Sequence, residues 1–319
     1  MSWLFGNTGK SDKRMDGKTA IVTGSSSGVG YHTALELYKR GGSVVLASRS
    51  LRKLQETEQR FKRYCANLKN VGQLSIIELD LSSLESVRKC AKTLLDQQPE
   101  IHILVNNAGV VLYNRELSED GYEMQFAVNH LGHFLLTLLL LPRIIRSAPS
   151  RIINVTSEPH CIANDIDLDN INCEESYFYH TVYSQTKLAN ILFSNELVRR
   201  LKACGVTGVT VYNANPGGVR TKMSDEFASM IFPGVLWLYR KIQWLVLHSP
   251  VYGAATTIQC ALGESEGRQT GLYYTDCKVA VPPKSTKNEK KAKQLWDISI
   301  RMTQLVNKNR SDDDFFYSD

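Results

Sequence analysis

The chain has 319 residues, of which 43% are hydrophobic and 22% are charged, and its formal net charge is +6. A hydrophobic fraction of this size is ordinary for a globular protein and excludes a largely disordered chain. The lysines and arginines are dispersed along the sequence, without the focused basic patch of a nucleic-acid-binding protein. We therefore expect no nucleic-acid partner and anionic small ligands instead.

Short apolar, β-branched runs alternate with longer segments in which apolar residues recur at helical spacing. The predicted strands are 18–23, 43–48, 74–80, 101–106, 151–157 and 208–213. The predicted helices are 29–40, 51–68, 84–95, 123–145 and 183–202. Strands separated by helices of this length form parallel βαβ units, so we predict an α/β fold with a doubly wound, mostly parallel sheet.

No repeat and no Pro/Ser-rich linker divides the chain, so we predict one domain over residues 17–305. Residues 1–16 are interpreted as a frayed tail, and residues 306–319 as an acidic tail. The apolar stretch at residues 3–5 is far shorter than the ~20 residues that cross a bilayer, and it lacks a signal-peptide core. A shallow interfacial anchor is the alternative reading of this tail. We expect an intracellular protein that is not secreted, either cytoplasmic or peripheral to a membrane or lipid droplet.

The cysteines indicate a reducing compartment. Their number is odd and they form no CxxC pair, which argues against a disulfide framework and against a zinc site, so we expect no metal. We interpret them as structural thiols; they are Cys65, Cys90, Cys161, Cys173, Cys204, Cys260 and Cys277.

A glycine-rich segment, Thr23–Gly30 (TGSSSGVG), lies between the first predicted strand and the first predicted helix. Glycines there let the backbone turn tightly and approach a pyrophosphate, which rests on the unpaired N–H groups of the helix N-terminus. A tight turn without a ligand is the alternative. We predict that this turn binds a dinucleotide through Gly24, Ser26, Ser27, Gly28, Val29 and Gly30.

The end of the second predicted strand indicates which dinucleotide is preferred. An acidic residue there would hold the ribose 2′-OH of NAD, whereas an arginine would accept the 2′-phosphate of NADP. Residues 47–53 (ASRSLRK) contain no acid, and Arg49 can pair with a phosphate through its planar guanidinium. We therefore predict that NADP(H) is preferred over NAD(H), a solvated arginine being the alternative. Asp80 and Leu81 are predicted to reach the adenine, although Asp80 could instead serve the next helix N-terminus.

Polar and small residues also follow two later strands. Asn107, Ala108 and Gly109 come at the end of the fourth strand, where ligands bind in open α/β sheets. Ser157 comes at the end of the fifth strand, where its hydroxyl can hydrogen-bond a substrate oxygen and stabilise developing charge. On its own, the Asn-Asn-Ala-Gly segment could be a simple turn.

Tyr183 and Lys187 carry the predicted chemistry. They are four residues apart on a predicted helix, so their side chains share one face. A nearby ammonium favours the phenolate, as would an oxidised nicotinamide, so we expect the pKa of Tyr183 to lie below its ordinary value of about 10. Tyr183 would then donate a proton to a carbonyl oxygen or accept one from an alcohol. We predict that both residues also contact the cofactor.

Taken in this order, segments 23–30, 106–109 and 183–187 with Asn129 and Ser157 resemble the short-chain dehydrogenase/reductase family. The resemblance implies a Rossmann-type fold and hydride transfer between NAD(P) and an alcohol or carbonyl compound. It also implies that Asn129 joins Ser157, Tyr183 and Lys187 as a catalytic residue, holding a water that relays protons from Lys187. A helix asparagine bonded to backbone is the alternative.

A narrower likeness, to the retinol dehydrogenase group, covers nearly the whole chain and rests on segments 115–121, 129–137, 187–190, 215–219, 271–278 and 295–296. It implies NADP(H) and the interconversion of retinol and retinal or of other long apolar alcohols and aldehydes. The cofactor contacts expected from this likeness further along the chain are Pro216, Gly217, Val219 and Thr221.

Three further features bear on the substrate and the surface. Apolar residues recur at helical spacing over residues 227–247, which predicts a core-facing lid or a lipophilic entry that touches membrane. His160 is interpreted as a loop histidine, with a place in the substrate pocket as the alternative. Residues 284–293 are interpreted as a solvated helix face, with contact to anionic lipid as the alternative.

Two classes of function follow. The first is an NADP-dependent oxidoreductase for a small lipophilic substrate, with retinoids favoured over isoprenoid alcohols, steroids and lipid-derived aldehydes. The second is a cofactor-binding scaffold without turnover, which would not need the complete set of four catalytic residues. Peripheral contact with a membrane or lipid surface and assembly into a homodimer are further expectations.

Overall fold

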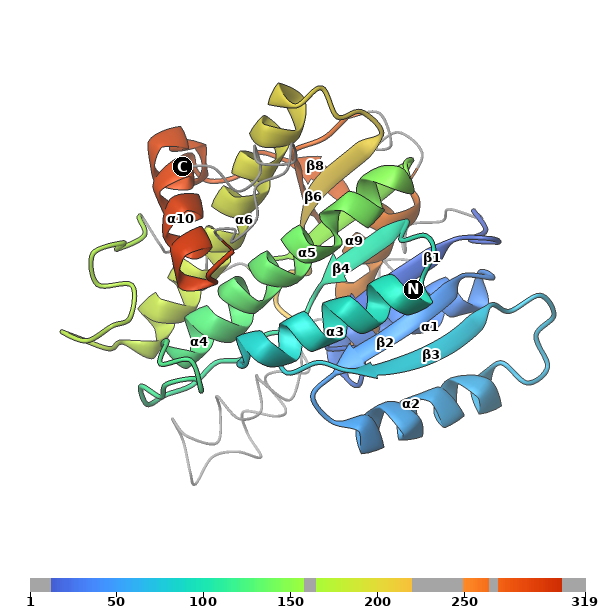
Figure 1. The fold of residues 1–319 in the computed structure, drawn as a ribbon. Helices are drawn as coiled ribbons and strands as arrows, with labels where there is room; N and C mark the ends of the chain where they lie inside the picture. The colour runs from blue at the N-terminus through green and yellow to red at the C-terminus, as the bar shows by residue number, and fades with distance from the viewer. Residues whose placement is uncertain (1–12, 158–164, 220–248, 264–268, 306–319) are drawn as a thin grey trace, which may run out of the picture.

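The computed structural model describes residues 13–157, 165–219, 249–263 and 269–305. Eight strands form one sheet in the order β3-β2-β1-β4-β5-β6-β7-β8 (Figure 1). All neighbours from β3 to β7 pair in parallel, whereas β7 and β8 pair antiparallel. The predicted doubly wound, mostly parallel sheet is therefore confirmed. The strands are β1 Thr19–Thr23, β2 Ser43–Ser48, β3 Gln73–Glu78, β4 Ile103–Asn106, β5 Ser150–Val155, β6 Val209–Asn215, β7 Leu272–Thr275 and β8 Lys278–Ala280.

Helices cover both faces of the sheet, as Figure 1 shows. The α-helices are α1 Gly28–Lys39, α2 Leu51–Tyr64, α3 Leu84–Gln97, α4 Met124–Phe126, α5 Gly132–Arg146, α6 Tyr179–Ala203, α9 Pro250–Leu262 and α10 Glu289–Met302. A π-helical turn, η2 (Ala127–Leu131), joins α4 to α5, and a 3₁₀ turn, η5 (Lys284–Lys287), precedes α10. Helices α3, α5 and α6 pack on one face, and α1, α2 and α9 on the other.

The alternating side chains of the strands feed two separate cores. In β1, Ile21 packs into the core beneath α3, α5 and α6, whereas Ala20 and Val22 pack into the core beneath α1, α2 and α9. All three side chains are fully buried. Because both faces of the sheet are covered, its strands read as continuous apolar runs.

Side-chain caps explain where several helices begin. The side-chain oxygens of Ser50, Ser83 and Asn288 accept hydrogen bonds from N–H groups in the first turns of α2, α3 and α10. Helix α6 begins at Tyr179, one turn before its predicted start, since Val182 is buried and adds to the apolar face.

The C-terminal elements α9, β7 and β8 were not predicted, and α10 was expected only as a helix face over residues 284–293. Helix α10 is held against the core by Trp296, which is 1% exposed and packs edge-on against Phe134. The guanidinium of Arg200 lies 4.5 Å from the Trp296 ring and forms an ion pair with Glu196 at 2.8 Å. The predicted solvated face over residues 284–293 is confirmed for four exposed lysines, Lys284, Lys287, Lys290 and Lys293.

By length and composition, one helical stretch in the described part of the chain, Met124–Arg146, could cross a membrane. It comprises α4, η2 and α5. In its most apolar window, 89% of the residues are buried inside the protein, as in the core helix of a soluble fold. The apolar side chains of this stretch are accounted for by packing within the domain.

Candidate active site

The predicted site residues meet at the carboxyl edge of the sheet, around the point where the strand order reverses. Strand β1 lies between β2 and β4, so the chain leaves β1 in one direction and returns on its other side. Ligands bind in the crevice that this reversal opens. The glycine turn follows β1, the Asn-Asn-Ala-Gly segment follows β4, and Ser157 follows β5.

The glycine turn is shaped by close backbone approach. Gly24 and Gly28 adopt φ angles of +66° and +60°, a region that favours glycine. A Cβ on Gly24 would lie 2.9 Å from the Cα of Ala108, and one on Gly30 would lie 2.6 Å from the carbonyl oxygen of Gly24. Both positions therefore require glycine on steric grounds.

The N-terminus of α1 opens toward this turn. Within the described part of the chain, the Ser27 side chain at the N-cap caps none of the first N–H groups of the helix. Ser27 is exposed and Ser26 half-buried. Uncapped N–H groups beside a glycine turn form an anion-binding cradle, so these residues fit a pyrophosphate.

Thr23 and Asn107 clamp the ends of β1 and β4 together. The Oγ1 of Thr23 accepts hydrogen bonds from the backbone N–H groups of Asn107 at 2.9 Å and Ala108 at 3.0 Å. The side-chain amide of Asn107 donates to the carbonyl oxygen of Thr23 at 2.8 Å. Asn107, a predicted cofactor contact, therefore helps to fix the shape of the crevice.

The residues predicted to distinguish NADP from NAD lie at the ends of β2 and β3. Arg49 is exposed, directly after β2, and forms no ion pair with any residue that the structure describes. The Oδ1 of Asp80 accepts hydrogen bonds from the backbone N–H and the hydroxyl of Ser82 at 2.9 and 2.6 Å. Asp80 therefore forms a local turn before α3, whose N-cap is Ser83, and its contact with the adenine stays a prediction. Leu81 is buried, and its carbonyl oxygen lies against Gly132 at the start of α5.

The segment after β6 closes the far side of the crevice. The backbone N–H of Gly217, which follows Pro216, donates to the Oδ1 of Asn215 at 3.0 Å. The side chain of Val219 packs closely on Gly253 in α9, next to Val29 in α1. Thr221 lies outside the described residues.

Ser157, Tyr183 and Lys187 are brought together as predicted. Tyr183, in α6, is hydrogen-bonded through its side chain to Ser157. The Nζ of Lys187 lies 5.7 Å from the centre of the Tyr183 ring and donates to the carbonyl oxygen of Val155 at 3.2 Å. Lys187 is 4% exposed, so its amine is held in a fixed position inside the protein.

The pKa of Tyr183 differs from the sequence-based expectation. Burial raises the pKa of this phenol, and the hydrogen bond with Ser157 lowers it by less, so the pKa lies above its ordinary value of 10.0. The prediction that Lys187 lowers the pKa of Tyr183 is therefore wrong for the protein chain alone. Burial also lowers the pKa of Lys187, to about 8, so the amine carries its charge only part of the time near that pH.

Asn129 lies in η2 and points toward the same centre. Its Oδ1 accepts from the backbone N–H of Val110 at 2.8 Å, and its Nδ2 donates to the Val110 carbonyl oxygen at 3.0 Å and to the Oγ1 of Thr186 at 3.1 Å. A Cβ on Gly109 would lie 3.2 Å from this Oδ1 and 3.4 Å from the Nζ of Lys187. The Oδ1 keeps one lone pair for a water, and the proton relay stays a prediction.

The comparisons with known proteins decide the family. A family model described as short chain dehydrogenase matches residues 18–231. The chain belongs to the short-chain dehydrogenase family. Retinol dehydrogenase 14 from Homo sapiens is 40% identical over 301 residues, covering 92% of this chain and 88% of its own. Retinol dehydrogenase 11 from Homo sapiens is 39% identical over 292 residues, covering 92% of this chain and 87% of its own. The resemblance inferred from the motifs is thus confirmed.

Solved structures show the same fold. An uncharacterized protein from Mycobacterium paratuberculosis matches with a TM-score of 0.71 at 29% identity, covering 92% of this chain and 95% of its own. The L-sorbose reductase from Gluconobacter frateurii, complexed with NADPH and L-sorbose, matches with a TM-score of 0.66 at 21% identity. It covers 83% of this chain and 96% of its own. These matches confirm the Rossmann-type fold of this short-chain dehydrogenase.

Two features beside the site were missed from the sequence. The rings of Tyr113, after β4, and Tyr179, at the start of α6, lie 4.3 Å apart between centroids. Tyr179 precedes Tyr183 by four residues, so the spacing places it on the same helix face. The second feature is His133, 2% exposed, whose Nε2 lies 2.9 Å from the Oγ1 of Thr23. No local sequence pattern predicts either contact.

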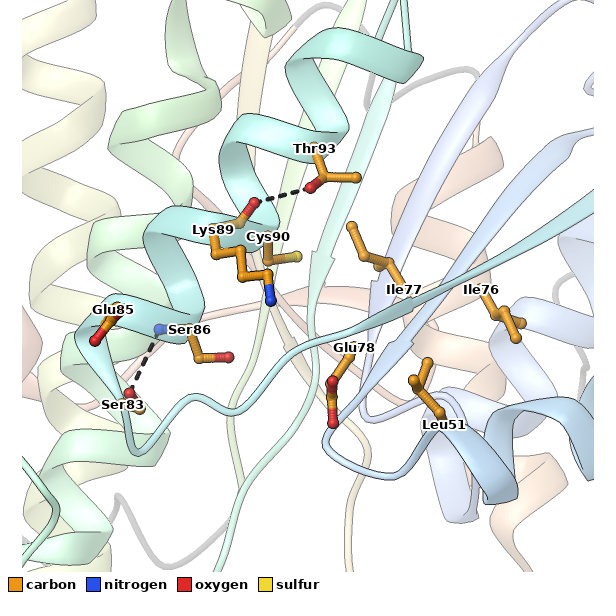
Figure 2. A pocket seen from close by; sticks show the side chains of 10 residues that line it. All are labelled: Leu51, Ile76, Ile77, Glu78, Ser83, Glu85, Ser86, Lys89, Cys90 and Thr93. Carbon is orange, nitrogen blue, oxygen red and sulfur yellow. Dashed lines mark hydrogen bonds between the residues drawn. The ribbon is translucent and has the colours of Figure 1, made fainter.

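A separate cavity of about 440 Å³ lies between α2, β3 and α3 of this short-chain dehydrogenase. Figure 2 shows side chains from all three elements lining it, among them Glu78 from β3 and Lys89 from α3. None of the predicted site residues that the structure describes lines it. Burial raises the pKa of the lining thiol Cys90 to about 12, so it is an inert structural cysteine.

Several other predictions fall partly or wholly outside the described residues. These are residues 1–12 of the N-terminal tail, the 227–247 segment, His160, Cys161 and the C-terminal tail 306–319. Within the described residues, no cysteine forms a disulfide, and the buried cysteines are Cys65, Cys90, Cys173 and Cys260.

Proposed function

We propose that this short-chain dehydrogenase is an NADP(H)-dependent oxidoreductase that interconverts a lipophilic alcohol and its aldehyde or ketone, with retinol and retinal as the favoured pair. The observation that carries the proposal is the junction of Ser157, Tyr183 and Lys187 at the carboxyl edge of the sheet, beside the glycine turn. The names of the relatives, retinol dehydrogenases 11 and 14, support the substrate class.

The crevice fits a dinucleotide on structural grounds. The turn from Gly24 to Gly30 and the uncapped start of α1 would hold the pyrophosphate. Arg49 would pair with the 2′-phosphate of NADP, for which no carboxylate on β2 competes. When bound, the nicotinamide supplies or accepts the hydride. The NADPH in the L-sorbose reductase structure is in keeping with this choice of cofactor.

The side chains of the site manage the proton. Because burial keeps the pKa of Tyr183 above its ordinary value, the phenol holds its proton at neutral pH and can donate it to a carbonyl oxygen during reduction. Ser157, bonded to the phenol, would hydrogen-bond the same oxygen as charge develops there. Lys187, when protonated, would stabilise the phenolate left behind. Oxidation of an alcohol runs these steps in reverse.

The aromatic pair Tyr113 and Tyr179 supports a flat, apolar substrate. The two rings lie next to each other, with Tyr179 one turn before Tyr183 in α6, and an extended polyene or a ring system could pack on them. Isoprenoid, steroid and lipid-derived carbonyl compounds have similar surfaces and are the alternative substrates. A contact of few methylene groups separates these classes only weakly.

The remaining parts of the proposal concern the cell. We propose an intracellular protein with peripheral contact to a membrane or lipid droplet, which the exposed lysines at the start of α10 support through their attraction for anionic lipid. Assembly into a homodimer stays a prediction, without an observation that favours it.

The test is turnover by the purified protein. NADPH and NADH consumption is measured with retinal, farnesal, nonenal and a ketosteroid, next to Tyr183→Phe. We expect NADPH-dependent reduction of retinal above the other substrates. Cofactor binding without turnover of any substrate would favour the scaffold function, and a preference for another substrate would replace retinal in the proposal.

A further inference from the structure

A buried histidine links the cofactor turn to the catalytic centre. His133, in the first turn of α5, is 2% exposed. Its Nε2 lies 2.9 Å from the Oγ1 of Thr23, the residue at the end of β1. Its Nδ1 lies 3.2 Å from the carbonyl oxygen of Asn129 in the π-helical turn. One imidazole therefore bridges the end of β1 and the π-helical turn that carries Asn129.

The hydrogen-bond partners fix the form of this imidazole. A carbonyl oxygen can only accept, so the Nδ1 facing Asn129 carries the proton. Burial lowers the pKa of His133 to about 3, so the ring is neutral at physiological pH and its Nε2 is an acceptor. Because this Nε2 can only accept, the hydroxyl of Thr23 donates to it, at 2.9 Å; the Val105 carbonyl oxygen, at 3.3 Å, is the more distant acceptor for the same hydroxyl.

The contact to Asn129 occurs where the helix is irregular. The π-helical turn Ala127–Leu131 takes the chain out of α-helical hydrogen-bonding register, and such turns are frequent at functional sites. The His133 side chain gives the Asn129 carbonyl a donor at this point. The same Asn129 holds the backbone of Val110 through both atoms of its amide, beside Lys187.

We propose that His133 is a positioning residue with two separable tasks: its Nε2 holds the Thr23 hydroxyl that shapes the dinucleotide crevice, and its Nδ1–H holds Asn129 beside Lys187. Resting on the proposed function, this assigns cofactor affinity to one ring nitrogen and turnover to the other. His133 itself is not placed against substrate.

Two conservative substitutions separate the tasks. In His133→Asn, the amide nitrogen takes the place of Nδ1 and can still donate to the Asn129 carbonyl, but nothing reaches Thr23. In His133→Gln, the amide oxygen takes the place of Nε2 and can still accept from Thr23, but the donor to Asn129 is lost. His130→Asn is the matched control, because His130 is equally buried, in the preceding turn η2, but bonds Ser299 in α10, away from the crevice.

NADPH affinity is measured by fluorescence titration, turnover by NADPH consumption, and folding by thermal unfolding. We expect His133→Asn to raise the Kd for NADPH about tenfold with kcat within twofold of wild type, as loss of one hydrogen bond allows. We expect His133→Gln to lower kcat about tenfold with the Kd unchanged. His130→Asn should lower the Tm without moving either quantity.

The two variants also define the results that would overturn the proposal. Equal losses of NADPH affinity and kcat in both, in proportion to the fall in Tm, would reduce His133 to a structural residue and overturn the proposal. If the wild-type protein reduces no tested substrate, the proposed function fails, but the NADPH titration still tests the role of His133 in cofactor binding. A Kd that rises in His133→Asn and not in His133→Gln supports the Thr23 task, and the opposite result refutes it.

Discussion

Replacing Lys187 by methionine should stabilise the folded protein while it removes the catalytic cation. Lys187 is 4% exposed and donates a hydrogen bond to the Val155 carbonyl oxygen, so its charge is buried with little compensation. Lowering its pKa from 10.5 to about 8 corresponds to about 3 kcal/mol of destabilisation while both the folded and unfolded states are protonated. Subtracting about 1 kcal/mol for the lost hydrogen bond leaves a gain of about 2 kcal/mol in Lys187→Met.

The pH dependence identifies the cause. The destabilisation is fully present below pH 8 and is relieved as the pH rises from about 8 towards 10.5, because the folded state then binds fewer protons than the unfolded state. Thermal unfolding of wild type and Lys187→Met is compared from pH 6 to 9.5. The variant should have the higher Tm by about 4 °C at pH 7, and the difference should shrink above pH 8. A variant that is less stable at pH 7, or a difference independent of pH, would refute the reasoning.

Three further predictions test the cofactor crevice and the cation. Arg49→Glu should raise the Kd for NADPH at least about tenfold and improve the use of NADH, since a carboxylate repels the 2′-phosphate and can bind a ribose hydroxyl. Steady-state kinetics with both cofactors measure this change, and an unchanged ratio of kcat/KM for NADPH to kcat/KM for NADH would contradict it. Gly30→Ala should weaken NADPH binding in titration and lower the Tm, because its Cβ would collide with the Asn107 amide and the Gly24 carbonyl, so wild-type values would contradict the close packing. The rate of carbonyl reduction should fall as the pH rises through about 8 and Lys187 loses its proton, and a flat kcat/KM profile from pH 6 to 9 would contradict this role.

Much of the fold is predictable because each βα unit carries its own hydrophobic pattern. Strand β2 begins and ends at the predicted residues, and α1 to α6 lie where helical spacing places them. Most of the C-terminal elements were missed, and α10 was expected only in part, because they depend on tertiary contacts. Strand β8 has three residues, and α10 is fixed by the burial of Trp296 against side chains from α5 and α6.

The site was predictable to the extent that function sits at strand ends. The order of the glycine turn, Ser157, Tyr183 and Lys187 along the chain was enough to predict that these residues lie close together. The contact between Thr23 and His133 joins residues 110 positions apart, so no local pattern indicates it. The direction of the Tyr183 pKa shift was also missed, because burial of the phenol depends on the packed structure and raises its pKa more than the hydrogen bond with Ser157 lowers it.

The most direct measurement is the turnover of Tyr183→Phe at saturating NADPH and retinal. The substitution removes one hydroxyl and leaves the ring, so the Kd for NADPH should stay within about twofold of wild type. Loss of the proton donor should lower kcat by about 10²- to 10⁴-fold, the range for general acid catalysis. A kcat within tenfold of wild type, with NADPH still bound, would contradict proton transfer by Tyr183.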